Sequence, residues 1–388
     1  MTILSIETSC DETAVSIVAA EGDFPHATYT VRGNALFSQV AIHREYGGVF
    51  PNLAKREHAR TLVPMLQQAL TEASLIEETT STLSSEQTEM LYETLYREEG
   101  LADTLITFFE TYNVPKIDLV AVTSGPGLEP ALWVGVNFAK ALSYIWDAPV
   151  VPVNHMEGHV LASMFDGEQL PDLQFPALAL LISGGHTELD LMHNWQKYER
   201  IGQTRDDAVG EAFDKVARML GLPYPGGPEI SRCAGEARAA GITPSISLPR
   251  PMIDSPELDF SFSGIKTAAR YAIEKLPELT PALINEVALE FENAVTEVLI
   301  KKAARAVEET HAQSLILGGG VSANTHIRTS FKDYFEKEYP NVSLYLPDPK
   351  LSTDNSIMIA LAGHAHAADA LGIDGQNTIR ADGNKSLA

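Results

Sequence analysis

Apolar and polar positions alternate along this chain with two periods, one typical of strands and one of helices. Short runs rich in Ile, Leu and Val predict strands, and the segments between them carry apolar residues every three or four positions, as amphipathic helices do. The expected strands cover residues 3–8, 14–20, 116–124, 150–154, 177–182, 188–192 and 314–317, and the expected helices cover 53–73, 134–145, 206–220, 287–307 and 356–371. Alternating strands and helices predict an α/β fold.

The pattern runs through the chain twice, which predicts two α/β halves. The first half is expected at residues 1–150 and the second at 151–350, followed by a closing helix within 351–375 and a polar tail, 376–388, that we expect to be mobile. Residues 77–111 interrupt the first half with a segment rich in Thr, Ser and Glu. We expect an insertion that is attached to the core rather than part of it.

Glycine-rich turns follow two of the expected strands. Residues 177–182 run into Ser183-Gly184-Gly185-His186-Thr187, and residues 314–317 run into Gly318-Gly319-Gly320-Val321-Ser322-Ala323-Asn324. Glycines let the backbone approach a phosphate closely, with N–H groups of the turn and of the following helix as donors. The turns therefore predict a bilobal enzyme that holds a nucleotide in its cleft.

Two histidines, His155 and His159, stand four residues apart directly after a β-branched run. If a helix begins there, both imidazoles leave the same face and can share one metal ion. Taken alone, this spacing is more often that of two unrelated histidines near a helix start. The glycine turns elsewhere in the chain favour the metal interpretation.

The charge balance argues against direct binding of nucleic acid over most of the surface. The 388 residues include 28 Lys and Arg against 52 Asp and Glu, a formal net charge of −24. Binding of nucleic acid would therefore need a local basic patch or a basic partner subunit. One candidate patch comprises His43, Arg44, Lys55, Arg56, His58 and Arg60. An ordinary solvated helix start explains these residues as well.

Composition also bears on location. Cys10 and Cys233 are the only cysteines, too few for a disulfide framework. The sequence has no apolar run of about eighteen residues, and the first strand begins at once without a basic leader. We therefore expect a cytoplasmic protein without membrane attachment.

Ten motifs follow one another in the order seen in the universal tRNA threonylcarbamoyladenosine transferases. They begin at Ser9, Tyr46, Gly125, Asn154, Ser183, Asp206, Tyr224, Phe260, Gly318 and Ser352, and read SCDET, YGGV, GPGL, NHMEGH, SGGHT, DDAVGEAFDK, YPGGP, FSFSG, GGGVSAN and STDN. Over roughly residues 2–370 the chain resembles the bacterial TsaD type of this family. The resemblance implies the actin-like, sugar-kinase and Hsp70-like (ASKHA) fold, with two duplicated α/β cores.

The resemblance also implies a reaction. Members transfer the threonylcarbamoyl group from threonylcarbamoyl-AMP to N6 of adenosine 37, in tRNAs that read codons beginning with A. The implied metal ligands are His155, His159 and Asp354. The metal is most often iron(II), and two imidazoles with one carboxylate suit zinc as well. Asp354 considered alone could simply cap the last helix.

The implied contacts to the intermediate involve both glycine turns. They are Leu181, Ile182, Ser183, Gly184, Gly185, Asp214, Gly227 and Asn324. A carboxylate such as Asp214 can accept both ribose hydroxyls, although an ordinary surface acid would look the same in sequence. Because N6 is a poor nucleophile, a base is expected nearby, and Asp11 and Glu12 are the candidates. The alternative for this pair is a solvated turn.

The family's partners are tRNA, a paralogous TsaB-like subunit and a TsaE-like P-loop ATPase. The chain departs from the family pattern at Asn52, Lys55 and Pro130, and in the longer insertion, so partner choice can differ. Two rival functions remain. An ASKHA-fold ATPase or sugar kinase explains the glycine turns but not the three metal ligands. A metallopeptidase needs H-E-x-x-H, whereas Met156 follows the first histidine here.

Overall fold

The computed structural model describes residues 1–79, 82–113, 116–275 and 278–388. The chain divides into two compact units. Unit 1 comprises Met1–Pro171 with Asp354–Leu387, and unit 2 comprises Asp172–Thr353. Relative to the expected halves, residues 151–171 lie with the first unit, because the strand and helix that they form pack on its sheet.

Unit 1 is built on a five-stranded sheet in the order β3-β2-β1-β6-β7. Its strands are β1 (Thr2–Glu7), β2 (Glu12–Glu21), β3 (Thr28–Ser38), β6 (Leu119–Gly125) and β7 (Val150–Asn154). β1, β2 and β3 pair antiparallel, whereas β1, β6 and β7 are parallel neighbours. Parallel neighbours need crossover connections, and helices supply them here.

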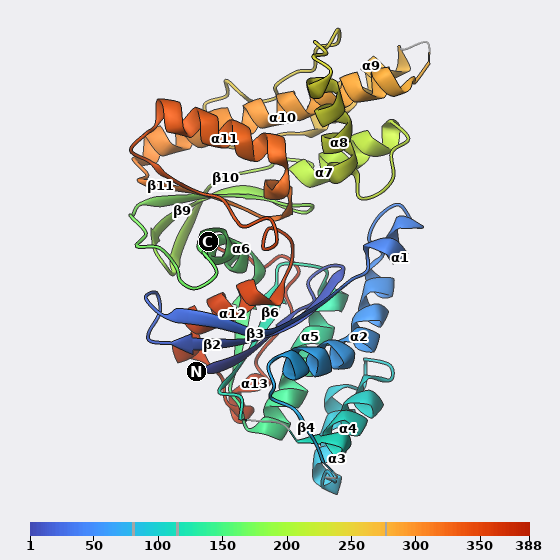
Figure 1. Ribbon diagram of the computed structural model, residues 1–388, viewed down its shortest axis with the longest axis vertical. Coiled ribbons are helices and arrows are strands. Elements are labelled where there is room, and N and C mark those ends of the chain that lie inside the picture. Colours follow the sequence, from blue (N-terminus) through green and yellow to red (C-terminus); the bar gives the residue numbers. More distant parts are fainter. Residues whose placement is uncertain (80–81, 114–115, 276–277) are drawn as a thin grey trace. The chain divides into compact units, whose positions relative to one another are not determined.

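Helices cover both faces of this sheet (Figure 1). The helices of unit 1 outside the insertion are α1 (Val40–Arg44), α2 (Pro51–Glu72), α5 (Glu129–Trp146), α6 (His155–Met164), α12 (Ser356–Ala365), η2 (Ala367–Asp369) and α13 (Ile373–Gln376), and of these α2, α5, α6 and α12 pack on the sheet. α2 and α5 pack on the face that carries Leu4, Ile6 and Val122. On the opposite face α12 comes close to β6 because Gly363 has no side chain, and a Cβ there would collide with Ala121.

The insertion forms two helices and a two-stranded sheet. β4 (Glu77–Glu78) pairs with β5 (Tyr112–Asn113), and between them lie α3 (Ser85–Thr94) and α4 (Leu101–Thr111). Residues 80–81 of this segment lie outside the described residues. The expectation that the insertion is only attached to the core was wrong. Leu91, Leu105 and Phe108 are buried in the core of unit 1, because α3 and α4 turn apolar faces toward α5 and α2.

Unit 2 repeats the topology of unit 1. Its sheet has the order β10-β9-β8-β11-β12, formed by β8 (Ala177–Ile182), β9 (Thr187–Asn194), β10 (Lys197–Gln203), β11 (Ser314–Gly318) and β12 (Ser343–Tyr345). β8, β9 and β10 pair antiparallel, and β8, β11 and β12 are parallel. The equal order and directions confirm the expected α/β fold with two duplicated cores.

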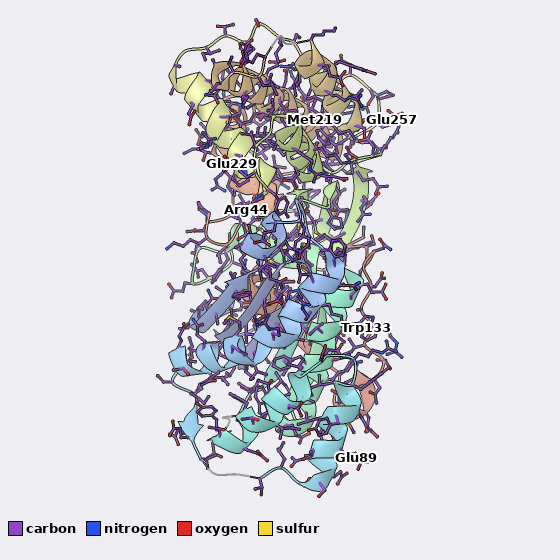
Figure 2. The ribbon with its side chains drawn as sticks, turned by 90° about the vertical axis from the view of Figure 1, so that its right-hand side faces the viewer. Arg44, Glu89, Trp133, Met219, Glu229 and Glu257 are labelled. Carbon is purple, nitrogen blue, oxygen red and sulfur yellow. The ribbon has the colours of Figure 1, made fainter. Side chains whose placement is uncertain are left out.

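The helices of unit 2 contribute to one large core. They are α7 (Val209–Met219), α8 (Gly226–Ala239), α9 (Ser263–Glu274), α10 (Pro281–Thr310), the short η1 (Gly320–Ala323) and α11 (Thr325–Glu338). Their apolar faces pack with Leu178, Leu180 and Leu315 of the sheet. Figure 2 labels Met219 at the end of α7 and Glu229 on α8. None of the helices within the described residues is long and apolar enough to cross a membrane.

Unit 2 also buries an ionic cluster on its antiparallel strands. Glu188 and Asp190 stand two residues apart on β9, so their side chains share a face, and Arg200 lies opposite Asp190 on β10. Arg200 Nη2 lies 2.7 Å from Glu188 Oε2, and its Nε lies 3.7 Å from Asp190 Oδ1. Burial raises the pKa of Asp190 to about 7; the Glu188 carboxylate adds to this and Arg200 opposes it.

The C-terminal segment differs from the sequence expectation in its structure. The last long helix, α12, ends at Ala365 rather than near residue 371. The tail 376–388, which we expected to be mobile, packs on unit 1. The Asp382 N–H donates to Ser124 O at 2.8 Å, and Asn154 Nδ2 donates to Ser386 O at 2.9 Å. Hydrogen bonds to the ends of β6 and β7 thus hold this polar segment on unit 1.

Candidate metal centre and nucleotide turns

The two predicted histidine ligands lie on the first turn of α6. β7 ends at Asn154, whose side chain caps the helix by accepting the Met156 N–H at 2.9 Å. The cap fixes the helix start, so His155 and His159 lie one turn apart on the same face. Their rings meet edge to face with centroids 4.7 Å apart, and both side chains are buried.

The third predicted ligand, Asp354, reaches the histidines from the segment that precedes α12. Its Oδ1 lies 3.2 Å from His159 Nε2 and 3.5 Å from His155 Nε2. A metal bound at about 2.0–2.2 Å from each ligand atom separates neighbouring ligand atoms by roughly 3–3.5 Å. The three side chains therefore fit a metal ion. The cap of α12 is Asn355, which accepts the Met358 N–H at 3.0 Å, so Asp354 is not needed for capping.

A buried carboxylate that sequence reasoning missed, Glu7, supports this triad. Glu7 is fully buried at the end of β1, and its Oε2 lies 3.0 Å from His155 Nδ1. Thr123 Oγ1 donates to the same oxygen at 2.6 Å, and the Ser9 N–H donates to Oε1 at 2.5 Å. With the Nδ1 proton held by Glu7, His155 presents Nε2 toward Asp354. The only sequence signal was an acid inside an apolar strand.

The electrostatics of the triad are those of a site for a cation. Burial alone would lower the pKa of His155, but the carboxylates of Asp354 and Glu7 raise that pKa well above its usual value. Burial alone would raise the pKa of Asp354, but the two imidazoles hold it well below its usual value. Two carboxylates thus surround two imidazoles within one buried cluster, and a divalent cation would balance their charge.

Of the predicted base candidates, Asp11 lies in the turn between β1 and β2 and Glu12 is the first residue of β2, both within electrostatic range of Asp354. Burial raises the pKa of Asp11, and the Asp354 carboxylate raises it further. Burial also raises the pKa of Glu12 well above its usual value, with added repulsion from Asp11 and Asp354. Carboxyl groups with raised pKa values are better proton acceptors than solvated ones. Their catalytic role stays a prediction.

A histidine on α2 holds this turn in place. His58 Nε2 lies 3.0 Å from Cys10 O, and its Nδ1 lies 2.8 Å from Thr13 Oγ1. Burial lowers the pKa of His58 to about 4, so the ring is neutral near pH 7 and Nε2–H donates to the carbonyl. His58 is therefore an internal support of the turn and does not belong to a surface patch.

The predicted basic patch is correspondingly smaller than the sequence suggested. His43 is fully buried, with its Nε2 lying 3.1 Å from Gln39 Oε1. Arg44, Arg56 and Arg60 remain exposed, whereas Lys55 is partly buried. Arg60 lies 2.9 Å from Glu57, which neutralises part of its charge.

The first predicted nucleotide turn lies at the carboxyl end of β8 in unit 2. Ser183 Oγ accepts the N–H groups of Gly185 at 3.3 Å and His186 at 3.0 Å, which fixes the turn. Gly184 and Gly185 are exposed, and a Cβ on either would meet nothing within 4 Å. The backbone of this turn is thus open to a ligand. Leu181 and Ile182 are fully buried, so they can reach a ligand only through their backbone.

The second turn follows β11, the parallel neighbour of β8, and therefore lies at the same edge of the sheet. Gly319 has φ +86°, and a Cβ there would lie 2.5 Å from Ile182 O. Only glycine combines this left-handed backbone with such a close approach. The structure thus brings the two predicted glycine turns into contact.

The remaining predicted contacts also have roles in the fold. Asp214, one turn after Gly210 on α7, accepts the Gly226 N–H at 2.7 Å through Oδ1, next to Gly227. Asn324 caps α11 by accepting the Ile327 N–H at 3.0 Å. Its Nδ2 donates to Glu292 Oε1 at 2.7 Å, and Glu292 is itself bound to Arg238. Asp214 and Asn324 thus position the turns that sequence reasoning assigned to the nucleotide.

Comparisons with known proteins agree with the motifs. A family model described as tRNA N6-adenosine threonylcarbamoyltransferase (TsaD) matches residues 30–81 and 103–361. A protein of that name from Polynucleobacter necessarius subsp. necessarius is 40% identical over 372 residues, covering 94% of this chain and 91% of its own. One from Staphylococcus aureus is 39% identical over 364 residues, with the same two coverages.

A solved structure supports the fold alone. The crystal structure of T. kodakarensis HypF aligns with a TM-score of 0.51 at 12% identity, and covers 97% of this chain and 50% of that chain. His155, His159 and Asp354 all fall within the residues that the family model matches.

Proposed function

Because this chain belongs to the family of tRNA N6-adenosine threonylcarbamoyltransferases, we propose that it transfers the threonylcarbamoyl group of threonylcarbamoyl-AMP to N6 of adenosine 37 in tRNAs that read codons beginning with A. The observation that carries this proposal is the convergence of His155, His159 and Asp354 in unit 1. A structural paralogue or a kinase of the same fold has no need of that set.

A divalent ion held by these three residues, iron(II) or alternatively zinc, would supply Lewis-acid stabilisation of negative charge on the carbamoyl and phosphate oxygens. Glu7 holds the Nδ1 proton of His155 and so keeps Nε2 available as a ligand. Asp11 or Glu12 would accept the proton that leaves N6, since burial raises the pKa of both.

The turns of unit 2 would bind the AMP portion. The N–H groups of Gly184 and Gly320 are suited to phosphate oxygens, because Gly184, Gly185 and Gly320 leave the backbone open. Asp214 is placed beside Gly227, where a carboxylate can accept ribose hydroxyls. Fixing the intermediate in this way lowers the entropy cost of the attack by N6.

The rival functions have less support. In a metallopeptidase a glutamate near the histidines would act as base, but Glu157 is buried and its carboxylate lies 2.9 Å from His366 Nε2. An ASKHA-fold ATPase or sugar kinase would leave the triad without a role.

Charge suggests how tRNA would be bound. With a net charge of −24, the chain would bind tRNA weakly alone, through Arg44, Arg56 and Arg60 with some help from Lys55. The TsaB-like subunit and the TsaE-like ATPase of the family are the expected partners that would complete the surface.

The test is the modification state of tRNA. We expect His155→Ala and His159→Ala to lose bound metal and to leave tRNA without threonylcarbamoyladenosine, as measured by mass spectrometry of tRNA nucleosides. The far-UV circular dichroism should remain that of the wild type, because the ligands project from a preformed helix. Full modification by a metal-free double variant would contradict the proposal.

A further inference from the structure

The insertion carries a charge and a surface that the transferase chemistry does not use. Residues 77–111 contain nine Asp and Glu residues against one Arg, a net charge of −8 out of −24 for the whole chain. The family model leaves out residues 82–102, which include all of α3. Figure 2 shows Glu89 on this helix at the edge of unit 1. The feature is therefore additional to the family's common core.

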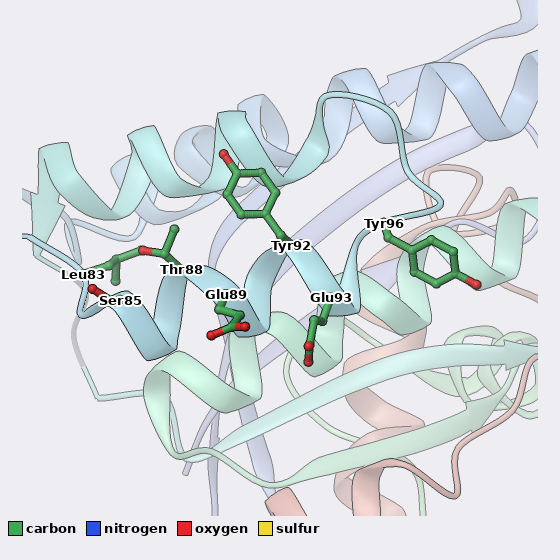
Figure 3. A pocket seen from close by; sticks show the side chains of 7 residues that line it. All are labelled: Leu83, Ser85, Thr88, Glu89, Tyr92, Glu93 and Tyr96. Carbon is green, nitrogen blue, oxygen red and sulfur yellow. The ribbon is translucent and has the colours of Figure 1, made fainter.

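The exposed side of α3 forms an open cavity of about 800 Å³ lined by two parallel rows of side chains (Figure 3). On the helix, Thr88 and Tyr92 form one row and Ser85, Glu89 and Glu93 form the other, each with a spacing of four residues; Tyr96 lies just past the end of α3. The tyrosines are unusually exposed, Tyr92 at 48% and Tyr96 at 71%. We call these six residues the α3 face.

One ring of this face already binds a guanidinium group. The side chain of Arg97 lies over the ring of Tyr96, 5.2 Å from its centroid, and Arg97 Nε donates to the Tyr96 hydroxyl at 2.5 Å. Cations are attracted to the faces of aromatic rings. A basic group from another molecule would meet the same ring, next to the exposed carboxylates of Glu89 and Glu93.

We propose that the α3 face is a docking surface for an amphipathic basic helix of a partner protein. Rows spaced by four residues form ridges on a helix, and the groove between them accepts the ridge of a second helix. The tyrosine row would contact apolar side chains of that helix, and the row of Glu89 and Glu93 would pair with its Lys or Arg residues. The local charge of −8 excludes RNA as the occupant.

The surface is independent of the metal centre, so it can be tested on the full-length protein without any assumption about catalysis. The probe is a labelled amphipathic helical peptide with one row of leucines beside one row of lysines. The control is a scrambled peptide of equal composition. Fluorescence anisotropy should show at least tenfold tighter binding of the patterned peptide.

Three variants test the chemistry of the face. The double variant Glu89→Lys/Glu93→Lys should weaken peptide binding by tenfold or more, and Tyr96→Ser should also weaken it. Arg97→Ala should strengthen binding, because it removes the internal competitor for the ring. Glu336→Lys, a reversal at an exposed acid on α11, is the matched control and should change binding less than twofold.

Several outcomes would overturn the proposal. Equal affinity for the scrambled peptide, or an equal loss with Glu336→Lys, would mean that the overall charge attracts the peptide. Self-association in sedimentation that the Glu89→Lys/Glu93→Lys variant abolishes would identify a second copy of this chain as the occupant instead. Metal content measured on the same samples keeps a failure here separate from a failure of the proposed function.

Discussion

Replacing Glu7 with Gln should weaken metal binding at the His155, His159 and Asp354 centre without unfolding the protein. The carboxylate accepts three hydrogen bonds at distances of 2.5–3.0 Å, from the Ser9 N–H, from Thr123 Oγ1 and from His155 Nδ1. Gln keeps one acceptor oxygen but turns an amide donor toward one of these donors. Either the orientation of His155 or the turn at Ser9 must then give way.

The expected size of the effect follows from this geometry. Loss of a carboxylate that orients a histidine ligand typically costs about 10–100-fold in metal affinity, or roughly 1.4–2.8 kcal/mol. We expect a result toward the upper end of that range. Glu7 has no exposed surface, so no solvent can replace its charge. One unpaired buried donor should also reduce the free energy of unfolding by about 1–3 kcal/mol.

The assay is competition with a chelator on the purified protein, read as a dissociation constant for zinc and for iron(II). Glu98→Gln is a suitable control, because Glu98 is a buried carboxylate in the insertion that accepts from Asn137 at 3.2 Å. That change should leave metal affinity within twofold of the wild type. A folded Glu7→Gln protein with wild-type affinity would refute the reasoning.

Three further predictions concern stability. Burial raises the pKa of Asp190 to about 7 in the folded protein, so the free energy of unfolding is highest below about pH 4 and falls as the pH rises through 7 and Asp190 loses its proton. Asp190→Asn should flatten this pH dependence in denaturant unfolding and stabilise the protein at pH 8 by up to about 4 kcal/mol. Gly363→Ala should reduce the free energy of unfolding by about 1–3 kcal/mol and release metal more readily, since the new Cβ would collide with Ala121. The control Gly235→Ala on α8, where a Cβ has open space, should not lower the melting temperature. Asn324→Ala should cost about 1 kcal/mol in thermal unfolding through loss of the α11 cap and should weaken protection by threonylcarbamoyl-AMP, whereas Asn324→Ser should retain the cap without placing a second carboxylate beside Glu292.

The sequence predicted the parts of the fold whose apolar pattern is strong. Central strands such as 177–182 are continuous apolar runs because the residues on both of their faces are buried, and α2 buries Leu62, Leu66 and Leu70 as its period required. Strand β3 was not predicted, because its exposed positions interrupt the apolar pattern along an edge of the sheet. Edge strands have few buried positions by which a sequence can reveal them.

The polar interior was beyond the reach of sequence reasoning. The motifs indicated which residues matter at the triad and turns, but not which polar atoms pair once they are buried. Glu7 bonds to a histidine 148 residues away, and His58 bonds to Thr13 across 45 residues. Periodicity reports only which face of an element is apolar. Pairings of this kind follow from the topology, which places β1 beside β6 and the end of β7.

The duplicated core explains how one topology supplies two kinds of chemistry. In both units a turn joins the first two strands: in unit 1 it carries Asp11 and leads directly into Glu12 at the start of β2, and in unit 2 it is the open turn at Gly184 and Gly185. A carboxylate turn suits proton transfer, and an open glycine turn suits a phosphate. The proposed metal ligands also follow equivalent strands, because α6 follows β7 and Asp354 follows the segment after β12, each the fifth strand of its sheet. Under the proposed function, equivalent strand ends in two copies of one core would thus serve as acid, phosphate-binding and metal-binding segments.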